Sequence, residues 1–209
     1  FYMMNNLSPH LFIDTFLYQD KKIHLLDYHI QRLTKAFSLY SLNQNISDQT
    51  ANSSQFAAVH FFNQCYQDIH KELLYKTKES YSYRIHVDWN LQSRTYTFKT
   101  DILSPLDKTL ALIKAPLAYP FKGLGLQTYK NQNRFYWNQV TENINLQTTD
   151  VIALSAEGLC VETSRFNLFF IKDQKAYTPT LQTGCVAGCF RQMSLDQKQL
   201  LIDNNTYPL

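Results

Sequence analysis

The sequence contains little glycine. Only 5 of its 209 residues are glycine, and none precedes Gly123. Glycine marks tight turns and places where the backbone comes close to a ligand. We therefore expect the loops with unusual backbone geometry to lie in the second half of the chain, near Gly123, Gly125, Gly158, Gly184 and Gly188.

Charge and paired cysteines are also scarce. Charged residues make up 18% of the chain and the formal net charge is +3, without a dense patch of Lys and Arg. This distribution argues against a nucleic-acid-binding protein. The four cysteines form no pair of Cys-x-x-Cys motifs, and the six histidines do not cluster with carboxylates. We therefore expect reduced thiols and no metal site.

Long apolar runs are absent as well. No segment approaches the length of a membrane span, and the first ten residues lack the basic-then-apolar order of a signal peptide. We expect a cytoplasmic protein without a membrane partner. The hydrophobic content of 44% in 209 residues is sufficient for a globular fold with a substantial core.

Hydrophobic periodicity predicts a mixed N-terminal region. A hairpin is expected first, with its turn at residues 19–21, followed by a helix for which Asp27 is a plausible N-cap. Further along, a second helix and a second hairpin are predicted, separated from the first helix by a polar loop. The predicted ranges are strands at 10–18 and 23–26, helix 27–42, loop 43–55, helix 56–75, strands 81–89 and 95–103, and strand 109–115.

The local sequence pattern changes between residues 116 and 125, and we place a domain boundary there. The prediction is an α+β fold with an N-terminal domain over residues 1–117 and a β-rich C-terminal domain over 118–209. The second domain is expected to contain a helix starting just after Lys130, four short strands, and a helix that follows Gly188. The strands are predicted at 150–155, 158–164, 166–172 and 176–179.

Glu162 interrupts a strand-like apolar segment. It lies in "GLCVETS", where residues alternate with strand periodicity, and an aromatic run follows directly at 166–171. A carboxylate in a protein core is costly unless a cation meets it. Two interpretations remain open from this segment alone. Glu162 either faces solvent from a half-exposed strand, which is the commoner case, or is buried opposite a cation.

Three further features have both an ordinary and a functional interpretation. Lys130 lies between a glycine-bearing loop and a helix, so it is either a solvated lysine or an amine placed for covalent chemistry. Arg32 lies one helical turn after His29 and is either a surface residue or a fork that binds phosphate. Gly188 precedes a helix whose first backbone N–H groups could bind an anion.

Taken together and in this order, four stretches carry a resemblance to a known family. They are "LLDYHIQRLTKAF", "YKNQNRFYWNQV", "SAEGLCVETSRFNLFFIKDQKAYTPTL" and "GCVAGCFRQ". The chain resembles the class IV, or fold type IV, pyridoxal-phosphate enzymes, which include D-amino-acid and branched-chain aminotransferases and 4-amino-4-deoxychorismate lyase. The resemblance implies a two-domain α+β fold, pyridoxal 5'-phosphate as cofactor, and a homodimer.

The resemblance also implies roles for individual residues. Lys130 would be the Schiff-base lysine that moves protons, and Glu162 would pair with the protonated pyridine nitrogen. Arg32 would hold the phosphate together with the helix that follows Gly188, through the backbone N–H groups of Cys189 and Phe190. The pairing of Glu162 with the pyridine nitrogen would explain why a carboxylate lies inside an apolar strand.

Two positions favour the lyase within this family. Aminotransferases of the branched-chain type usually have a threonine hydroxyl where this chain has Phe190, and a tyrosine near the cofactor's phenolic oxygen where this chain has Arg134. We therefore expect conversion of 4-amino-4-deoxychorismate to 4-aminobenzoate and pyruvate, a step toward folate. The alternatives are an aminotransferase acting on branched-chain or D-amino acids, and a non-catalytic relative that binds the cofactor, since the chain is shorter at both ends than the family pattern.

Overall fold

A computed structural model describes residues 10–43, 51–103, 109–130, 132–199 and 201–203 of the chain. Its internal contacts divide into two units. Unit 1 contains residues 1–105 and 129–132, and unit 2 contains residues 106–128 and 133–209. This division differs from the predicted boundary after residue 117 at two places. Residues 106–117 group with unit 2, and Lys130, predicted to belong to the C-terminal domain, groups with unit 1.

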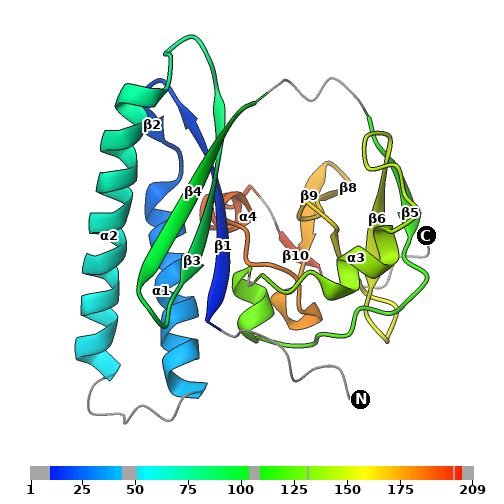
Figure 1. Cartoon of the computed structure of the whole chain (residues 1–209). Helices are drawn as coiled ribbons and strands as arrows, with labels where there is room; N and C mark the ends of the chain where they lie inside the picture. The colour runs from blue at the N-terminus through cyan, green and yellow to red at the C-terminus, as the bar shows by residue number, and fades with distance from the viewer. Residues whose placement is uncertain (1–9, 44–50, 104–108, 131, 200, 204–209) are drawn as a thin grey trace. The chain divides into compact units, whose positions relative to one another are not determined.

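Unit 1 is a four-stranded antiparallel sheet with two helices on one face (Figure 1). The strand order is β2-β1-β3-β4. The elements are β1 (Leu11–Gln19), β2 (Lys22–Ile23), α1 (Leu26–Asn43), α2 (Ala51–Lys76), β3 (Tyr83–Asn90) and β4 (Thr95–Ile102).

Strict alternation along β1 and β3 produces the two faces of this sheet. Every second residue of β1 and of β3 is buried, including Phe12 and Phe16 on β1 and Val87 and Trp89 on β3. These side chains face the helices, as the contact between Phe62 of α2 and Trp89 illustrates, with ring centroids 5.3 Å apart. We call the opposite side the helix-free face; His86 of β3 lies on it.

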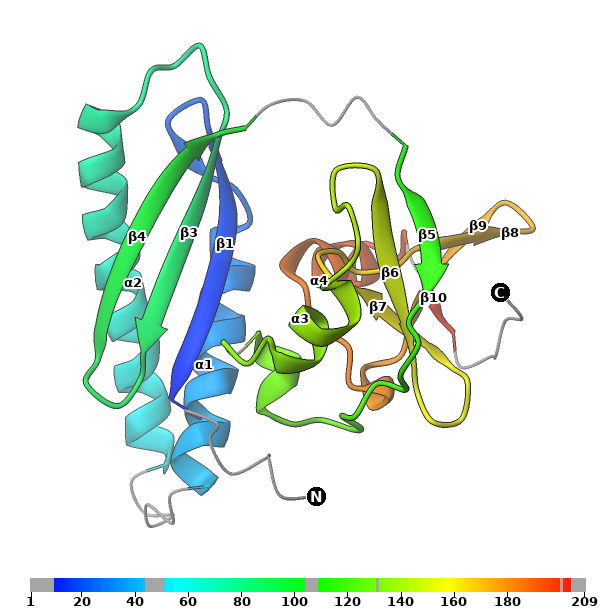
Figure 2. The same cartoon turned by 45° about the vertical axis from the view of Figure 1, so that its right-hand side comes forward.

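Unit 2 contains two three-stranded sheets, ordered β5-β6-β7 and β10-β9-β8, and two short helices (Figure 2). Tyr119, Tyr136 and Trp137 contact one another in its core, with ring centroids 5.0 to 5.7 Å apart. The elements are β5 (Ala111–Lys114), α3 (Phe135–Thr141), β6 (Thr149–Leu154), β7 (Cys160–Thr163), β8 (Phe170–Lys172), β9 (Lys175–Pro179), α4 (Cys189–Asp196) and β10 (Leu201–Asp203), with 3-10 turns at Leu126–Tyr129 and Leu181–Thr183.

Several predicted boundaries are wrong by a few residues. The first helix already begins at Leu26, so Asp27 lies in its first turn and is not its N-cap. The second helix begins at Ala51, so residues 51–55 are helical and not part of a loop; residues 44–50 of that predicted loop lie outside the described residues. Serine and asparagine in "ANSSQ" favour turns as readily as helix starts, so local sequence could not decide this boundary.

Two differences concern unit 2. The helix expected directly after Lys130 begins only at Phe135, because residues up to Gln132 pair with β1 instead. A short strand, β10, pairs in parallel with β9 and was not predicted. The stretch predicted as helix after Gly188 extended to Leu201, the first residue of this strand. Among the described helices, none combines the length and the apolar character that a membrane span needs.

Candidate functional site

The segment around Lys130 forms an additional antiparallel pairing at the start of β1. The backbone N–H of Ile13 donates to the Lys130 carbonyl at 2.8 Å, and that of Gln132 donates to the Leu11 carbonyl at 3.0 Å. The amine of Lys130 donates to Oγ1 of Thr15 at 3.1 Å. Backbone and side chain of Lys130 are therefore both held by β1.

Lys130 adopts a left-handed backbone conformation with φ of +64°. For a residue other than glycine this conformation costs about 1–2 kcal/mol and persists where the surroundings fix it. The side chain of Gln132 contributes to this fixation, because its Nε2 donates to Oδ1 of Asp88 on β3 at 2.9 Å. The same carboxylate oxygen lies 3.3 Å from Nε2 of His86. Contacts to two strands thus position the lysine.

Arg32 lies on the other side of the same sheet. Its side chain is 7% exposed, and its Nη2 donates to the buried carboxylate of Asp14. Asp14 also lies 2.8 Å from Nδ1 of His29 and accepts the hydroxyl of Tyr66. Burial tends to raise the pKa of Asp14, but the nearby His29 and Arg32 outweigh it and hold that pKa well below its usual range.

The structure does not bring the Arg32 guanidinium and the Lys130 amine together within unit 1. Asp14 and Thr15 are successive residues of β1, so their side chains point to opposite faces of the sheet. Arg32 contacts the first and Lys130 contacts the second. The phosphate contact expected for Arg32 stays a prediction, and the guanidinium is held by Asp14 on the helix-covered face.

In unit 2, Glu162 is buried in β7 and is only 5% exposed. The interpretation that it faces solvent is therefore wrong. Its Oε2 accepts the backbone N–H of Val186 at 2.9 Å and Nδ2 of Asn167 at 3.5 Å. Asn167 also donates to the Val186 carbonyl at 2.9 Å. The carboxylate is thus fixed by the loop that leads into α4.

The field of Glu162 extends to three other groups of unit 2, of which Cys185 and Tyr119 are buried and Arg134 is exposed. Burial, followed by the neighbouring Glu162 charge, raises the pKa of the Cys185 thiol to about 11. The same two causes raise the pKa of Tyr119. Burial lowers the pKa of Arg134, and Glu162 opposes that shift. Both the Cys185 thiol and the Tyr119 hydroxyl are therefore neutral near pH 7.

Arg134 was predicted to lie near the cofactor, and the structure shows which protein groups it contacts. It immediately precedes α3, and its Nη2 donates to the Ser164 carbonyl at 2.8 Å. Ser164 follows the end of β7 and its hydroxyl donates to the fully buried Asp150 at 2.6 Å. The guanidinium is therefore held in the electrostatic surroundings of Glu162, and its contact with a cofactor stays a prediction.

The start of α4 lies close to the side chain of Asn167. Gly188 is the N-cap residue, and a Cβ added to it would lie 1.9 Å from Oδ1 of Asn167. An added Cβ would therefore force the Asn167 side chain to move and disturb its contacts with Val186 and Glu162. Of the next two residues, Cys189 is buried and Phe190 is 58% exposed. Because the first N–H groups of a helix attract anions, this end of α4 is the anion-binding candidate of unit 2.

Three residues of these clusters were not singled out from the sequence. Asp14 alternates with Phe12 and Phe16 on β1, the same pattern that marked Glu162, and this signal could have found it. Asn167 stands in the "FNLFF" stretch that contributed to the resemblance, without a role of its own. Gln132 is close to Lys130 in sequence, but its partner on β3 cannot be read from local sequence.

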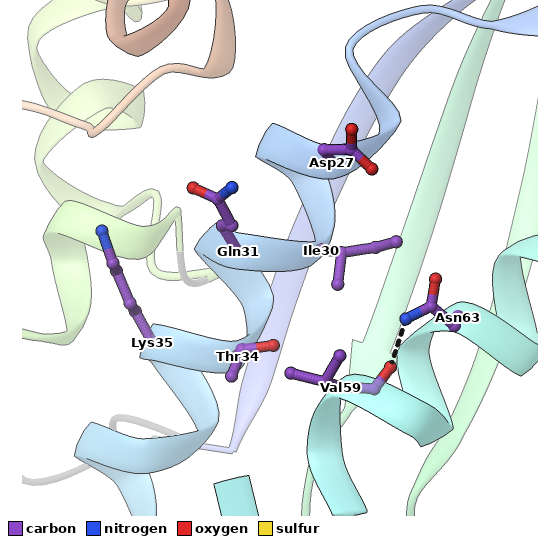
Figure 3. A pocket seen from close by; sticks show the side chains of 7 residues that line it. All are labelled: Asp27, Ile30, Gln31, Thr34, Lys35, Val59 and Asn63. Atoms are coloured by element: carbon purple, nitrogen blue, oxygen red, sulfur yellow. Dashed lines mark hydrogen bonds between the residues drawn. The ribbon is translucent and has the colours of Figure 1, made fainter. Parts of the chain in front are cut away.

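A pocket of about 350 Å³ lies elsewhere in unit 1, between α1 and α2 (Figure 3). The amide of Asn63 at its edge donates to the Val59 carbonyl of its own helix. The lining residues are Asp27, Ile30, Gln31, Thr34, Lys35, Val59 and Asn63. None of them is a predicted site residue, and the pocket lies on the helix-covered side of the sheet, away from Lys130.

Comparisons with known proteins agree with the resemblance noted in the sequence. The model of the family "Amino-transferase class IV" matches residues 11–205. An aminodeoxychorismate lyase of Vibrio harveyi is 34% identical over 83 residues, which cover 36% of this chain and 30% of that protein.

Solved structures share the fold. A candidate amino-acid aminotransferase of Mesorhizobium loti matches with a TM-score of 0.72 and 18% identity, over 94% of this chain and 87% of the other. A hypothetical aminotransferase of Mycobacterium tuberculosis in its PLP-bound form matches with a TM-score of 0.64 and 16% identity, over 97% and 73%. Since the family model spans nearly the whole sequence, the chain belongs to the class IV aminotransferase family, with its α+β fold type IV architecture.

Proposed function

We propose that this protein binds pyridoxal 5'-phosphate and acts as a lyase on 4-amino-4-deoxychorismate. The observation that carries the proposal is Glu162, a carboxylate 5% exposed that is fixed by Val186 and Asn167 at the loop leading into α4. A buried carboxylate suits a protonated pyridine nitrogen, and a helix start suits a phosphate. When bound, the cofactor supplies an electron sink for the carbon that bears the substrate amine.

The residues present fit this cofactor in their chemistry. Unit 2 provides Glu162 and the start of α4 behind Gly188, where Asn167 enforces a close backbone approach. Unit 1 provides Lys130, whose neighbours in the chain, Thr128 and Asn133, group with unit 2. The family membership of the chain supports the same cofactor.

Lys130 would carry the proton transfers. Its Nζ, positioned by the Thr15 hydroxyl, would remove the proton from the amine-bearing carbon of the substrate and hold it. In the lyase reaction the bond between the ring carbon and the ether oxygen then breaks. The enolpyruvyl group takes up a proton and leaves as pyruvate, while the ring becomes aromatic as 4-aminobenzoate. This route needs neither a second amino acceptor nor an oxidant.

Two positions favour the lyase over an aminotransferase acting on branched-chain or D-amino acids. Phe190 offers no hydroxyl at the start of α4, where a threonine is usual in branched-chain aminotransferases. Arg134 donates to the Ser164 carbonyl where those enzymes usually have a tyrosine. The partial similarity to the Vibrio harveyi lyase points in the same direction.

Product analysis tests the reaction. We expect the purified protein with added pyridoxal phosphate to release pyruvate and 4-aminobenzoate in equal amounts from 4-amino-4-deoxychorismate. Lys130→Ala should abolish the release, and Lys122→Ala, which alters an exposed lysine of unit 2, should not. Conversion of the cofactor's amine form to its aldehyde form by a keto acid, without pyruvate release, would identify an aminotransferase. Cofactor binding without either reaction would identify a non-catalytic relative.

The quaternary state is a separate proposal that rests on the family resemblance. We propose a homodimer, and light scattering should then give a mass near twice the 24.5 kDa of the chain. A mass of one chain at micromolar concentration would contradict it.

A further inference from the structure

The helix-free face of the unit 1 sheet carries a row of polar side chains beside Lys130. The Lys130 amine contacts Thr15 on β1, Thr15 is the direct cross-strand partner of His86 on β3, and His86 is the partner of Lys99 on β4. Directly opposed residues of neighbouring strands place their side chains on the same face. Thr15, His86 and Lys99 therefore form one continuous row that begins at the proposed catalytic lysine.

The carboxylates on this face are already engaged. Asp88 accepts Nε2 of Gln132 and lies 3.3 Å from His86, and Asp101 pairs with Arg84 at 2.9 Å. Lys99 is exposed, and within the described part of the chain it takes part in no ion pair. Among the described residues of this face, two carboxylates thus stand against four basic side chains, those of Lys22, Arg84, Lys99 and Lys130, and Lys99 is the one in direct register with His86.

We propose that Lys99, assisted by His86, binds a carboxylate of the substrate that is remote from the reacting amine. This inference rests on the proposed function, because it assumes that the amine reacts at Lys130. Neighbouring strands lie about 4.8 Å apart, so the backbone of β4 at Lys99 is about 10 Å from that of β1 at Thr15. In an α-amino acid the carboxylate is on the carbon next to the amine, so it is too close to the amine to span this distance. Lys99 and Lys130 would both have to extend toward it.

The row therefore selects a substrate class. A planar six-membered ring with an amine at one end and a carboxylate at the opposite end places its two functional groups along the row, with the ring above Thr15 and His86. His86 is fixed by Asp88, so its ring can present its other nitrogen to the ligand. The geometry favours ring amino-carboxylates over branched-chain amino acids.

Binding of 4-aminobenzoate to the purified protein tests this row without any turnover. Aniline, which lacks the carboxylate, serves as the paired ligand. Because a hydrogen bond to a charged group changes affinity by roughly tenfold, we expect Lys99→Gln to weaken 4-aminobenzoate roughly tenfold and to leave aniline unchanged. Lys99→Glu should weaken 4-aminobenzoate further. His86→Asn should have a smaller effect in the same direction.

Arg84→Gln is the matched control, because Arg84 lies two residues before His86 on the same face and already pairs with Asp101. It should leave the affinity for 4-aminobenzoate unchanged. Equal effects of Lys99→Gln and Arg84→Gln, or no effect of either, would overturn the proposal. If the protein binds no cofactor and releases no pyruvate, yet 4-aminobenzoate affinity depends on Lys99, the proposed function is wrong while the carboxylate row stands.

Discussion

The two units each bury a carboxylate, and they stabilise it in different ways. In unit 1, Asp14 is fully buried and contacts the cationic side chain of Arg32, the imidazole of His29 and the hydroxyl of Tyr66. In unit 2, Glu162 accepts a backbone N–H and a side-chain amide, both of which are neutral donors. Both residues interrupt an alternating apolar strand, so the sequence pattern is the same.

The difference indicates what each carboxylate is for. Side chains from α1 and α2 neutralise Asp14 and thereby tie both helices to β1, which is a structural task. A backbone N–H and a side-chain amide hold the Glu162 carboxylate in place, and its field reaches Tyr119, Cys185 and Arg134. A fixed negative charge of this kind is suited to a cationic ligand group.

The largest effect on stability is expected for Asp14→Asn. Removing one partner of a buried ion pair leaves the remaining charge uncompensated and typically costs about 3–5 kcal/mol. Chemical denaturation monitored by circular dichroism should detect this loss. Asp101→Asn is the control, since the Asp101 side chain is 54% exposed and its ion pair lies at the surface. Similar stability losses in the two variants would contradict the structural role of Asp14.

The pH dependence of stability should follow from the same cluster. The pKa of Asp14 is depressed in the folded protein, so its stabilising contribution is present above its unfolded value of about 3.9 and is lost as the pH falls below it. Wild type should therefore lose more stability than Asp14→Asn between about pH 5 and pH 2. Parallel stability curves for the two proteins would show that Asp14 does not carry this dependence.

Gly188→Ala tests the approach of Asn167 to the start of α4. The added Cβ would lie 1.9 Å from Asn167 Oδ1, and steric overlap in a packed region typically costs about 1–3 kcal/mol. Gly158→Ala is a useful contrast, because its φ of +83° brings backbone strain while no atom lies within 4 Å of the added Cβ. We expect only Gly188→Ala to weaken pyridoxal phosphate binding, measured by absorbance titration. If both variants bind pyridoxal phosphate equally well, the start of α4 does not contribute to cofactor binding.

Glu162→Gln should have the smallest effect on stability. The amide keeps an oxygen for the Val186 N–H, so the change in unfolding free energy should be about 1 kcal/mol. The reaction should nevertheless be lost, because a neutral amide cannot keep a pyridine nitrogen protonated. Thermal melts and pyruvate release, measured on the same preparation, separate the two effects. A variant that keeps full activity would show that Glu162 is a structural residue like Asp14.

Local pattern predicted every described strand except β10, because alternation of apolar and polar residues is a direct sign of a strand with one buried side. The burial of Glu162 needed the family resemblance, since alternation alone also allowed it to face solvent. The placement of Lys130 in unit 1 could not be predicted. It depends on backbone hydrogen bonds to Ile13 and Leu11 and on the contact between Gln132 and Asp88, more than forty residues apart in sequence.

Arg32 illustrates a different limit. Its spacing from His29 on one helix was visible in the sequence, but the buried carboxylate that both contact comes from β1. A fork-shaped guanidinium suits phosphate and carboxylate alike, so residue type could not distinguish a ligand contact from an internal ion pair.

The central claim is that Lys130 is the lysine to which pyridoxal phosphate attaches. It is tested most directly by adding the cofactor, reducing with borohydride, and locating the modified lysine by peptide mass spectrometry. We expect one modified site, Lys130, with a visible absorption band that reduction removes, and neither feature in Lys130→Ala. An absent band, or a label distributed over surface lysines and unchanged in Lys130→Ala, would contradict the account.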